Sequence, residues 1–204
     1  MTEEKTKKPL SKAPAKAAKA AKSGKTVASS KPAKAPSVKA TKETKPIVKK
    51  AAKPAKKSGD HLVLETTKGS VTIRLRPDLA PNHVARIKEL ATSGFYNGVP
   101  FHRVIDGFMA QTGDPTGTGM GGSGQKLKAE FSIEPHVRGV CSMARAQNPD
   151  SGDSQFFICF GDARFLDRQY TVWGQVIDGM ENVDKIKRGE PVQNPDKIIS
   201  AMVS

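Results

Sequence analysis

The run from Phe101 to Gln111 combines one arginine with apolar residues and contains no nucleophile. Arg103 does not lose its proton, so it cannot act as a general base, but its guanidinium can donate several hydrogen bonds in a fixed plane. Among apolar neighbours these donors would polarise a bound group. The run therefore indicates a site that binds and polarises rather than one that cleaves.

This run is predicted to be a β-hairpin. Apolar residues stand on both sides of Asp106-Gly107, and an Asp-Gly pair is a strong signal for a two-residue hairpin turn. Strand alternation sends Arg103 and Ile105 to one face and the residues beside them to the other. Arg103 is then expected to share a face or rim with Gln111.

The rest of the pattern predicts many short strands and few helices. A helix is expected to start at Pro81, because an apolar stripe at helical spacing follows it, and to end at 93–94. A second, short helix is expected at 180–186. The other predicted strands are His61–Thr66, Ser70–Leu75, Gly139–Met143, Gln155–Phe160, Thr171–Ile177 and Lys197–Val203. This mainly β pattern favours a closed antiparallel barrel or a sandwich, and it does not distinguish between these two folds.

The charge of the chain is concentrated at its N-terminal end. The whole chain has a formal net charge of +14, and residues 1–59 alone carry +15 from 18 lysines and three glutamates. These residues include no aromatic side chain, so they cannot bury a core that offsets chain entropy. We therefore expect a disordered basic tail at 1–59 and one folded domain at 60–204.

No apolar run in the sequence has the length of a signal peptide or a membrane span. We expect a cytoplasmic, monomeric protein that does not bind membranes. The alternatives for its location are association with the nucleoid or the ribosome, or the nucleus in a eukaryote. A mitochondrial transit peptide is disfavoured because such peptides prefer arginine, and the tail has none.

Several separated motifs resemble the signatures of the cyclophilins, which are peptidyl-prolyl cis-trans isomerases. The first is the run from Phe101 to Gln111, and the second is SQFFI at 154–158. Shorter matches stand at 94–98, 113–114, 142–144 and 165–167, in the order and roughly the spacing of the family. The resemblance covers about residues 60–204. It implies a closed eight-stranded antiparallel β-barrel capped by two helices, with the ligand site on its outer face and no cofactor.

The resemblance also implies roles for individual residues. Arg103 would be the catalytic residue, which approaches the prolyl nitrogen and weakens amide resonance. The matches to the proline pocket are Phe108, Met109, Phe157 and Leu166. The matches to the peptide-contacting groove are Gln111, Ala144, Arg145 and Gln155. Without the resemblance, Arg103 would be expected in a surface ion pair with Asp106 or Asp114.

Three positions depart from the pattern of the family. Arg145 replaces a frequent asparagine that contacts the peptide through its backbone, so this change is expected to matter little. Phe165 stands where many eukaryotic members have tryptophan, and Tyr170 where many have histidine. Phe165 keeps an apolar wall but lacks the indole N–H, which is expected to weaken cyclosporin binding. Tyr170 is expected to line the pocket.

Other motifs in the chain are weak. A GxGxxG pattern at 117–122 fits the letter of a dinucleotide-binding fingerprint, but Asp114-Pro115 breaks the preceding strand and no periodic helix follows, so a surface loop is favoured. His102 is expected to point away from Arg103 as a structural residue. Ser142 and the serine at 154 lack a nucleophile motif, which makes hydrolysis improbable.

Neither a metal nor a cofactor is predicted. The four histidines, His61, His83, His102 and His136, lack the short spacing of a metal site. Cys141 and Cys159 lie in apolar runs and are expected to be small buried hydrophobes rather than a disulfide.

Two classes of function remain. An isomerase would act on proline-containing peptides and on unfolded or folding proteins, and the presence of Arg103, Phe108 and Gln111 favours this activity. A binding protein would use its barrel as a proline-binding adaptor and its tail, which resembles linker-histone tails, to bind DNA or RNA without sequence preference. The other interpretation of the tail is a solvated linker or a tether near the ribosome.

Overall fold

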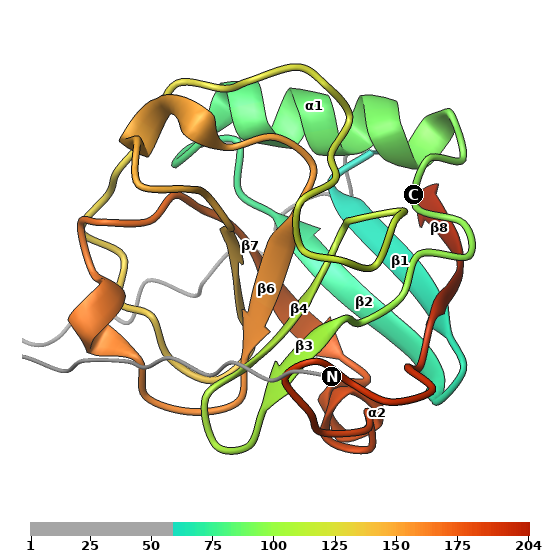
Figure 1. Ribbon diagram of the computed structural model, residues 1–204. Helices are drawn as coiled ribbons and strands as arrows, with labels where there is room; N and C mark the ends of the chain where they lie inside the picture. Colours follow the sequence, from blue (N-terminus) through green and yellow to red (C-terminus); the bar gives the residue numbers. More distant parts are fainter. Residues whose placement is uncertain (1–58) are drawn as a thin grey trace, which may run out of the picture. The chain divides into compact units, whose positions relative to one another are not determined.

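Eight antiparallel strands form one curled sheet in this computed structural model, which describes residues 59–204 (Figure 1). The strands are β1 (His61–Thr66), β2 (Gly69–Leu75), β3 (Arg103–Ile105), β4 (Met109–Thr112), β5 (Val140–Met143), β6 (Phe156–Cys159), β7 (Val172–Asp178) and β8 (Ile198–Val203). Their order across the sheet is β3-β4-β6-β5-β7-β2-β1-β8. The disorder predicted for the tail concerns residues that, except for Gly59, lie outside the described part.

The sheet does not close into the predicted barrel, and that expectation is wrong. Its edge strands β3 and β8 share no ladder within residues 59–204. The segments beside the gap are joined by isolated bridges, at Val104–Gly189 and at Pro100–Lys197, and by single backbone hydrogen bonds. Strand β3 has three residues, and the chain entering β8 contains two prolines, which lack the N–H that a ladder requires. The result is a curled half-barrel whose open side is filled by loop backbone.

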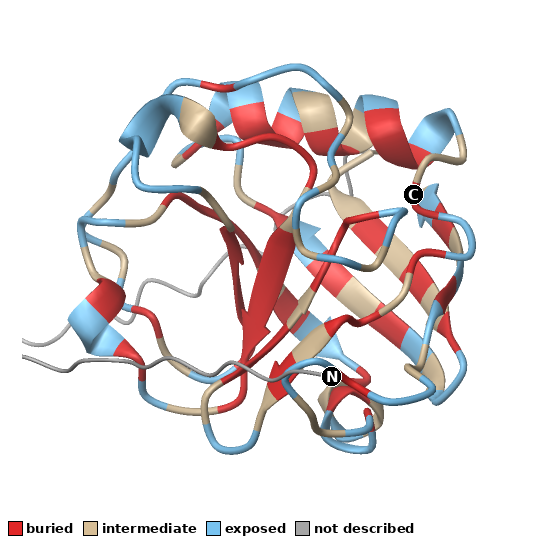
Figure 2. Cartoon of the chain, in the orientation of Figure 1, coloured by how far each residue is buried: buried red, intermediate tan, exposed pale blue. Residues whose placement is uncertain are grey.

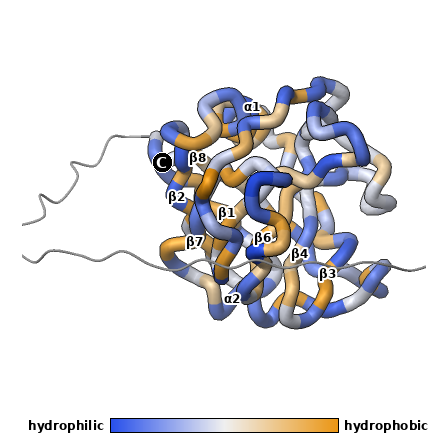
Figure 3. Tube along the Cα trace, turned by 90° about the vertical axis from the view of Figure 1, so that its left-hand side faces the viewer, coloured by the Kyte–Doolittle hydropathy of each residue, from blue (hydrophilic) through white to orange (hydrophobic). Residues whose placement is uncertain are grey.

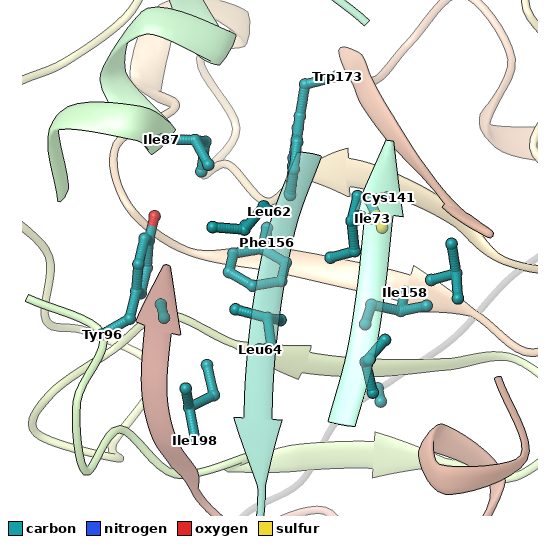
Figure 4. Close-up of a cluster of buried hydrophobic side chains, with 14 of the residues drawn as sticks. Leu62, Leu64, Ile73, Ile87, Tyr96, Cys141, Phe156, Ile158, Trp173 and Ile198 are labelled. Carbon is teal, nitrogen blue, oxygen red and sulfur yellow. The ribbon is translucent and has the colours of Figure 1, made fainter. Parts of the chain in front are cut away.

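The core lies on the concave side of the curled sheet. Buried positions alternate with more exposed ones along β1 and β2, as expected for strands with one face in a core (Figure 2). Figure 3 shows the hydropathy of the residues along the same strands. Side chains from β1, β2, β6, β7, β8 and one helix converge there (Figure 4). The ring of Phe156 meets those of Trp173 and Tyr96 edge to face, with centroids 5.2 and 5.6 Å apart. Burying such large apolar side chains supplies most of the stability of a small domain.

Two helices lie at opposite ends of the curled sheet (Figure 1). Helix α1 (Pro81–Thr92) has proline at its first position, as predicted, and buries Val84, Ile87 and Leu90 against the core. Helix α2 (Met180–Asp184) is two residues shorter than predicted. Within residues 59–204 neither helix has the length and apolar character needed to cross a membrane. Single 3-10 turns occur at Pro149–Ser151 and Arg164–Leu166.

The hairpin of β3 and β4 differs from its prediction by one residue. Ile105 pairs with Met109, so the loop contains three residues rather than two. The N–H of Phe108 donates to the carbonyl of Ile105 at 3.1 Å, and Gly107 takes a left-handed φ of 68° that favours glycine. Phe108 thereby leaves the ladder. Arg103 comes to lie directly opposite Gln111.

Buried carboxylates hold the glycine-rich loop that follows β4. Asp114 is fully buried and accepts hydrogen bonds from the backbone N–H groups of Thr116, Gly119 and Gly121, at 2.7 to 3.1 Å. A side chain at position 121 would place its Cβ 2.1 Å from Asp114 Oδ1, so only glycine fits there. Burial opposes ionisation of Asp114, but these hydrogen bonds outweigh it and lower its pKa to about 2. The buried carboxylate of Asp114 therefore holds the backbone of this loop in place.

Acid is expected to weaken this loop between about pH 4 and pH 2. The pKa of Asp114 is lower in the folded chain than in the unfolded chain, so its stabilising contribution is present above pH 4 and is lost as the pH falls through about 2. We predict that Asp114→Asn lowers the free energy of unfolding at pH 7 by about 2 kcal/mol, measured by urea denaturation. The loss in free energy of unfolding should become smaller toward pH 2. Asp178 is exposed, so Asp178→Asn should show no such loss. A deficit independent of pH would contradict this assignment.

Candidate active site

The candidate site is centred on one row of paired residues on the convex side of the sheet. Arg103, Gln111 and Phe157 stand opposite one another across β3, β4 and β6. The neighbouring row, on the other face, is buried in the core and consists of Val104, Ala110 and Ile158. Strand alternation therefore separates a core row from a site row, as the sequence predicted for Arg103.

A pocket of about 110 Å³ opens over this row. Its lining residues are Arg103, Phe108, Met109, Gln111, Ala144, Arg145, Phe157, Leu166 and Tyr170. Met109 and Phe157 are almost completely buried and belong to a second apolar cluster outside the main core. The ring of Tyr170 meets that of Phe157 edge to face at 5.7 Å. The structure thus brings nine of the eleven predicted residues together around an apolar floor with polar groups at its rim.

The two remaining predicted residues, Gln155 and Phe165, do not line this pocket. Gln155 lines a neighbouring hollow of about 380 Å³, which shares Gln111, Ala144 and Arg145 with the pocket. Phe165 is 66% exposed and lies beside Phe108, with ring centroids 5.4 Å apart. Phe165 therefore extends the apolar rim rather than the pocket wall.

A relay of amide groups fixes the orientation of Gln111. Its Nε2 donates to Oε1 of Gln155 at 2.9 Å, and Nε2 of Gln155 donates to the carbonyls of Gly119 and Gly121 at 3.0 and 2.7 Å. The loop that holds these carbonyls is itself held by Asp114. Within the described residues no donor reaches Oε1 of Gln111. This oxygen is available to a ligand, such as the N–H of a peptide.

Arg145 has a larger structural role than the sequence suggested. Its Nε and Nη2 donate to the carbonyl of Gln169 at 3.1 and 2.9 Å, and its Nη1 donates to the carbonyl of Ala146 at 2.9 Å. The guanidinium carbon lies 4.6 Å from the ring centroid of Tyr170, within range of a cation–π interaction. The side chain therefore joins two loops and supports one wall of the pocket. These side-chain contacts were not foreseen from the sequence, and the small effect expected for the replacement of asparagine by Arg145 stays a prediction.

Arg103 has an acidic partner that the sequence did not identify. Neither Asp106 nor Asp114, the two candidates from sequence, pairs with it. Its Nε donates to Oε1 of Glu190, which lies 87 residues further along the chain. In residues 59–204 no hydrogen bond engages the Nη groups, and the side chain is 39% exposed. These two groups are free to donate to a ligand at the rim of the pocket.

A buried polar group supports the floor of the pocket from within. The ring of His136 stacks on Phe157 at 6.4 Å, while its Nδ1 lies 2.9 Å from Asp167 and its Nε2 3.0 Å from Ser142. Serine, histidine and aspartate are the residue types of a hydrolase triad. However, Ser142 is fully buried and its hydroxyl donates to the carbonyl of Thr171. A substrate cannot reach this serine. The group holds Phe157 and the loop of Asp167 in place.

His102 and the two cysteines also have structural positions. His102, which directly precedes β3, is buried, and neither ring nitrogen has a hydrogen-bond partner within residues 59–204. Burial lowers the pKa of this histidine. Cys141 and Cys159 are buried free thiols, as predicted, and burial raises the pKa of Cys159 to about 12. None of these groups faces the pocket.

Comparisons with known proteins agree on one family. Residues 61–203 match the family model described as cyclophilin type peptidyl-prolyl cis-trans isomerase. A protein named probable peptidyl-prolyl cis-trans isomerase from Brucella suis is 54% identical over 159 residues, which cover 70% of this chain and 81% of the relative. A peptidyl-prolyl cis-trans isomerase from Helicobacter pylori is 44% identical over 138 residues, covering 66% of this chain and 84% of the relative.

Solved structures give the same result. The cyclophilin AquaCyp293 from Hirschia baltica superposes with a TM-score of 0.66 at 33% identity, covering 71% of this chain and 74% of the other. A cyclophilin type isomerase from Cryptosporidium parvum, crystallised in the presence of the dipeptide Ala-Pro, also gives 0.66 at 29% identity, covering 71% and 98%. The chain therefore belongs to the cyclophilin-type peptidyl-prolyl cis-trans isomerases.

Proposed function

We propose that this isomerase rotates the X-Pro bond in the pocket over β3, β4 and β6, with Arg103 as the residue that stabilises the twisted amide. The observation that carries the proposal is the pairing of Arg103 with Gln111 at the rim of a pocket floored by Met109 and Phe157. This arrangement offers a cation, an amide and an apolar cavity within one site. Those are the groups needed to hold a proline ring and the peptide bond before it.

The energetics of bond rotation suit such a site. The uncatalysed barrier is about 18 to 20 kcal/mol, and rotation unaided takes tens to hundreds of seconds. A rate on the order of 10³ per second requires a barrier of roughly 13 kcal/mol, so the site must contribute about 5 to 7 kcal/mol. One preorganised donor directed at charge that develops in the transition state contributes about 3 to 4 kcal/mol. Binding that favours the twisted amide over the planar one must supply the rest.

Each group has a defined task in this mechanism. As the peptide bond twists, the prolyl nitrogen loses conjugation and gains a lone pair that can accept a hydrogen bond. The free Nη groups of Arg103 are the donors for this nitrogen and for the adjoining carbonyl. Oε1 of Gln111 accepts from the peptide backbone and fixes the bound chain. Rotation breaks no covalent bond, so neither an acid, a base nor a nucleophile is needed.

We also propose that the substrates are proline-containing peptides and unfolded or folding proteins. Apolar side chains stand exposed around the pocket, since Phe165 is 66% and Met120 is 91% exposed. Such residues can contact the apolar side chains that an unfolded chain leaves in water. The related structure from Cryptosporidium parvum, crystallised with Ala-Pro, supports a proline-containing ligand. The cytoplasmic location, the monomeric state and weak cyclosporin binding stay predictions from sequence.

Replacing Arg103 tests the proposal directly. We predict that Arg103→Ala lowers kcat/KM on a proline peptide by about 10²- to 10³-fold, because one preorganised donor is lost, while the folded structure persists. Arg103→Lys should recover only part of the rate, since lysine lacks the planar fork. Arg138→Ala, which removes an exposed arginine paired with Asp184 outside the pocket, is the control and should be active. A near-normal rate in Arg103→Ala would refute this role and would mean that other groups of the pocket stabilise the twisted amide.

The proposal for the tail rests on charge alone. We propose that residues 1–59, with a formal charge of +15, tether the enzyme to nucleic acid. A polycation binds phosphates without reading bases, with a Kd of about 10⁻⁴ to 10⁻⁶ M at physiological salt. The folded domain beginning at Asp60 carries a formal charge of −1, so it lacks this attraction.

A gel-shift assay across a salt series separates the two parts. The full chain should shift DNA and RNA with an affinity that falls steeply as salt rises, because counterions are released on binding. A shortened chain beginning at Asp60 should not shift either, although it should isomerise proline peptides at the same rate. Equal shifts by both chains would rule out the tether.

A further inference from the structure

The segment that fills the gap between β3 and β8 also reaches Arg103. Residues 187–192 run beside β3, where Val104 and Gly189 exchange two backbone hydrogen bonds of 2.8 Å and the N–H of Val192 donates to the carbonyl of His102 at 3.1 Å. Glu190 stands between these two anchor points. Its carboxylate therefore lies beside the strand that carries Arg103.

Neighbouring side chains hold this segment independently of Glu190. Nε of Arg188 lies 3.0 Å from Asp106, and its guanidinium carbon lies 4.1 Å from the ring centroid of Phe160. The N–H of Lys187 donates to Asp196 at 2.8 Å. The backbone at residue 190 is thus fixed by at least three separate contacts. The pair between Glu190 and Arg103 follows from this placement rather than producing it.

The pair engages one edge of the guanidinium only. Oε1 of Glu190 accepts from Nε of Arg103, and within residues 59–204 the Nη groups of this pocket-lining residue make no hydrogen bond. Both partners are partly exposed, at 55% and 39%, so the pair contributes little to overall stability. A free arginine side chain, however, samples many rotamers. Holding its Nε restricts this sampling and directs the Nη groups toward the pocket.

We propose that Glu190 is a positioning residue for isomerisation, a role that rests on the proposed function of Arg103. The carboxylate keeps the guanidinium in the orientation that meets the twisted amide, so a ligand does not have to order it. The charge of Glu190 could also have the opposite effect on the rate, and experiment can distinguish the two effects. If the carboxylate acted only by its charge, it would weaken the positive potential at the pocket, and its removal would raise the rate.

The test compares Glu190→Ala and Glu190→Gln with a matched control. Asp184→Asn breaks a similarly exposed pair, Arg138 with Asp184, outside the pocket. Glu190→Ala should lower kcat about 5- to 20-fold with KM changed less than twofold, since ground-state binding of the proline ring does not need the oriented donor. Glu190→Gln keeps an acceptor oxygen and should lose less. Asp184→Asn should keep the wild-type rate, and all variants should keep the wild-type Tm.

A double variant separates this inference from the proposed function. In the Arg103→Ala background, Glu190→Ala should cause no further loss, because there is no guanidinium left to orient. Full activity of Arg103→Ala itself would overturn the role of Arg103. Loss of activity in Arg103→Ala, together with wild-type or raised kcat in Glu190→Ala and Glu190→Gln, would overturn only the role of Glu190. An equal loss in both Arg103 backgrounds would mark Glu190 as structural and also reject positioning.

Discussion

The register of β3, β4 and β6 is the constraint on which both the core and the site depend. In this register Arg103, Gln111 and Phe157 form one row and Val104, Ala110 and Ile158 the next. Because side chains alternate between faces, a slip of one residue would carry the first row into the core and the second row into water. The three-residue loop that ends at Phe108 sets the register, and Gly107 supplies the left-handed conformation that this loop requires.

The site is rigid because its polar groups are held from several directions. Gln111 is oriented through Gln155 by a loop whose backbone is bound to Asp114. Arg145 joins two loops around Tyr170, and the segment that fills the sheet gap brings Glu190 to Arg103. Such preorganisation is what a catalyst of bond rotation needs, because its donors must be in place before the amide twists. Because the sheet does not close, the segment that fills its gap can place Glu190 beside Arg103.

Much of the fold was predictable because its signals are local. Alternation identified β1 and β2, proline and an apolar stripe identified α1, and the motif resemblance identified all nine residues that line the pocket. What failed depends on contacts distant in sequence or on backbone atoms. Glu190 lies 87 residues from Arg103, and the partners of Arg145 are carbonyls that no side-chain pattern displays. The sheet stays open because β3 has only three residues, and the apolar run that begins at Phe101 did not predict so short a strand.

We propose that a fixed cation assists bond rotation without acid or base chemistry, and a pH–rate profile is the most direct test of this mechanism. A guanidinium keeps its proton and a carboxamide has no ionisable proton in this range. Burial lowers the pKa of His102, which precedes Arg103 in the chain. We predict that kcat/KM for a proline peptide stays constant within about twofold from pH 6 to pH 9, with no appreciable solvent deuterium isotope effect. A bell-shaped or sigmoidal profile that changes tenfold across this range would contradict it.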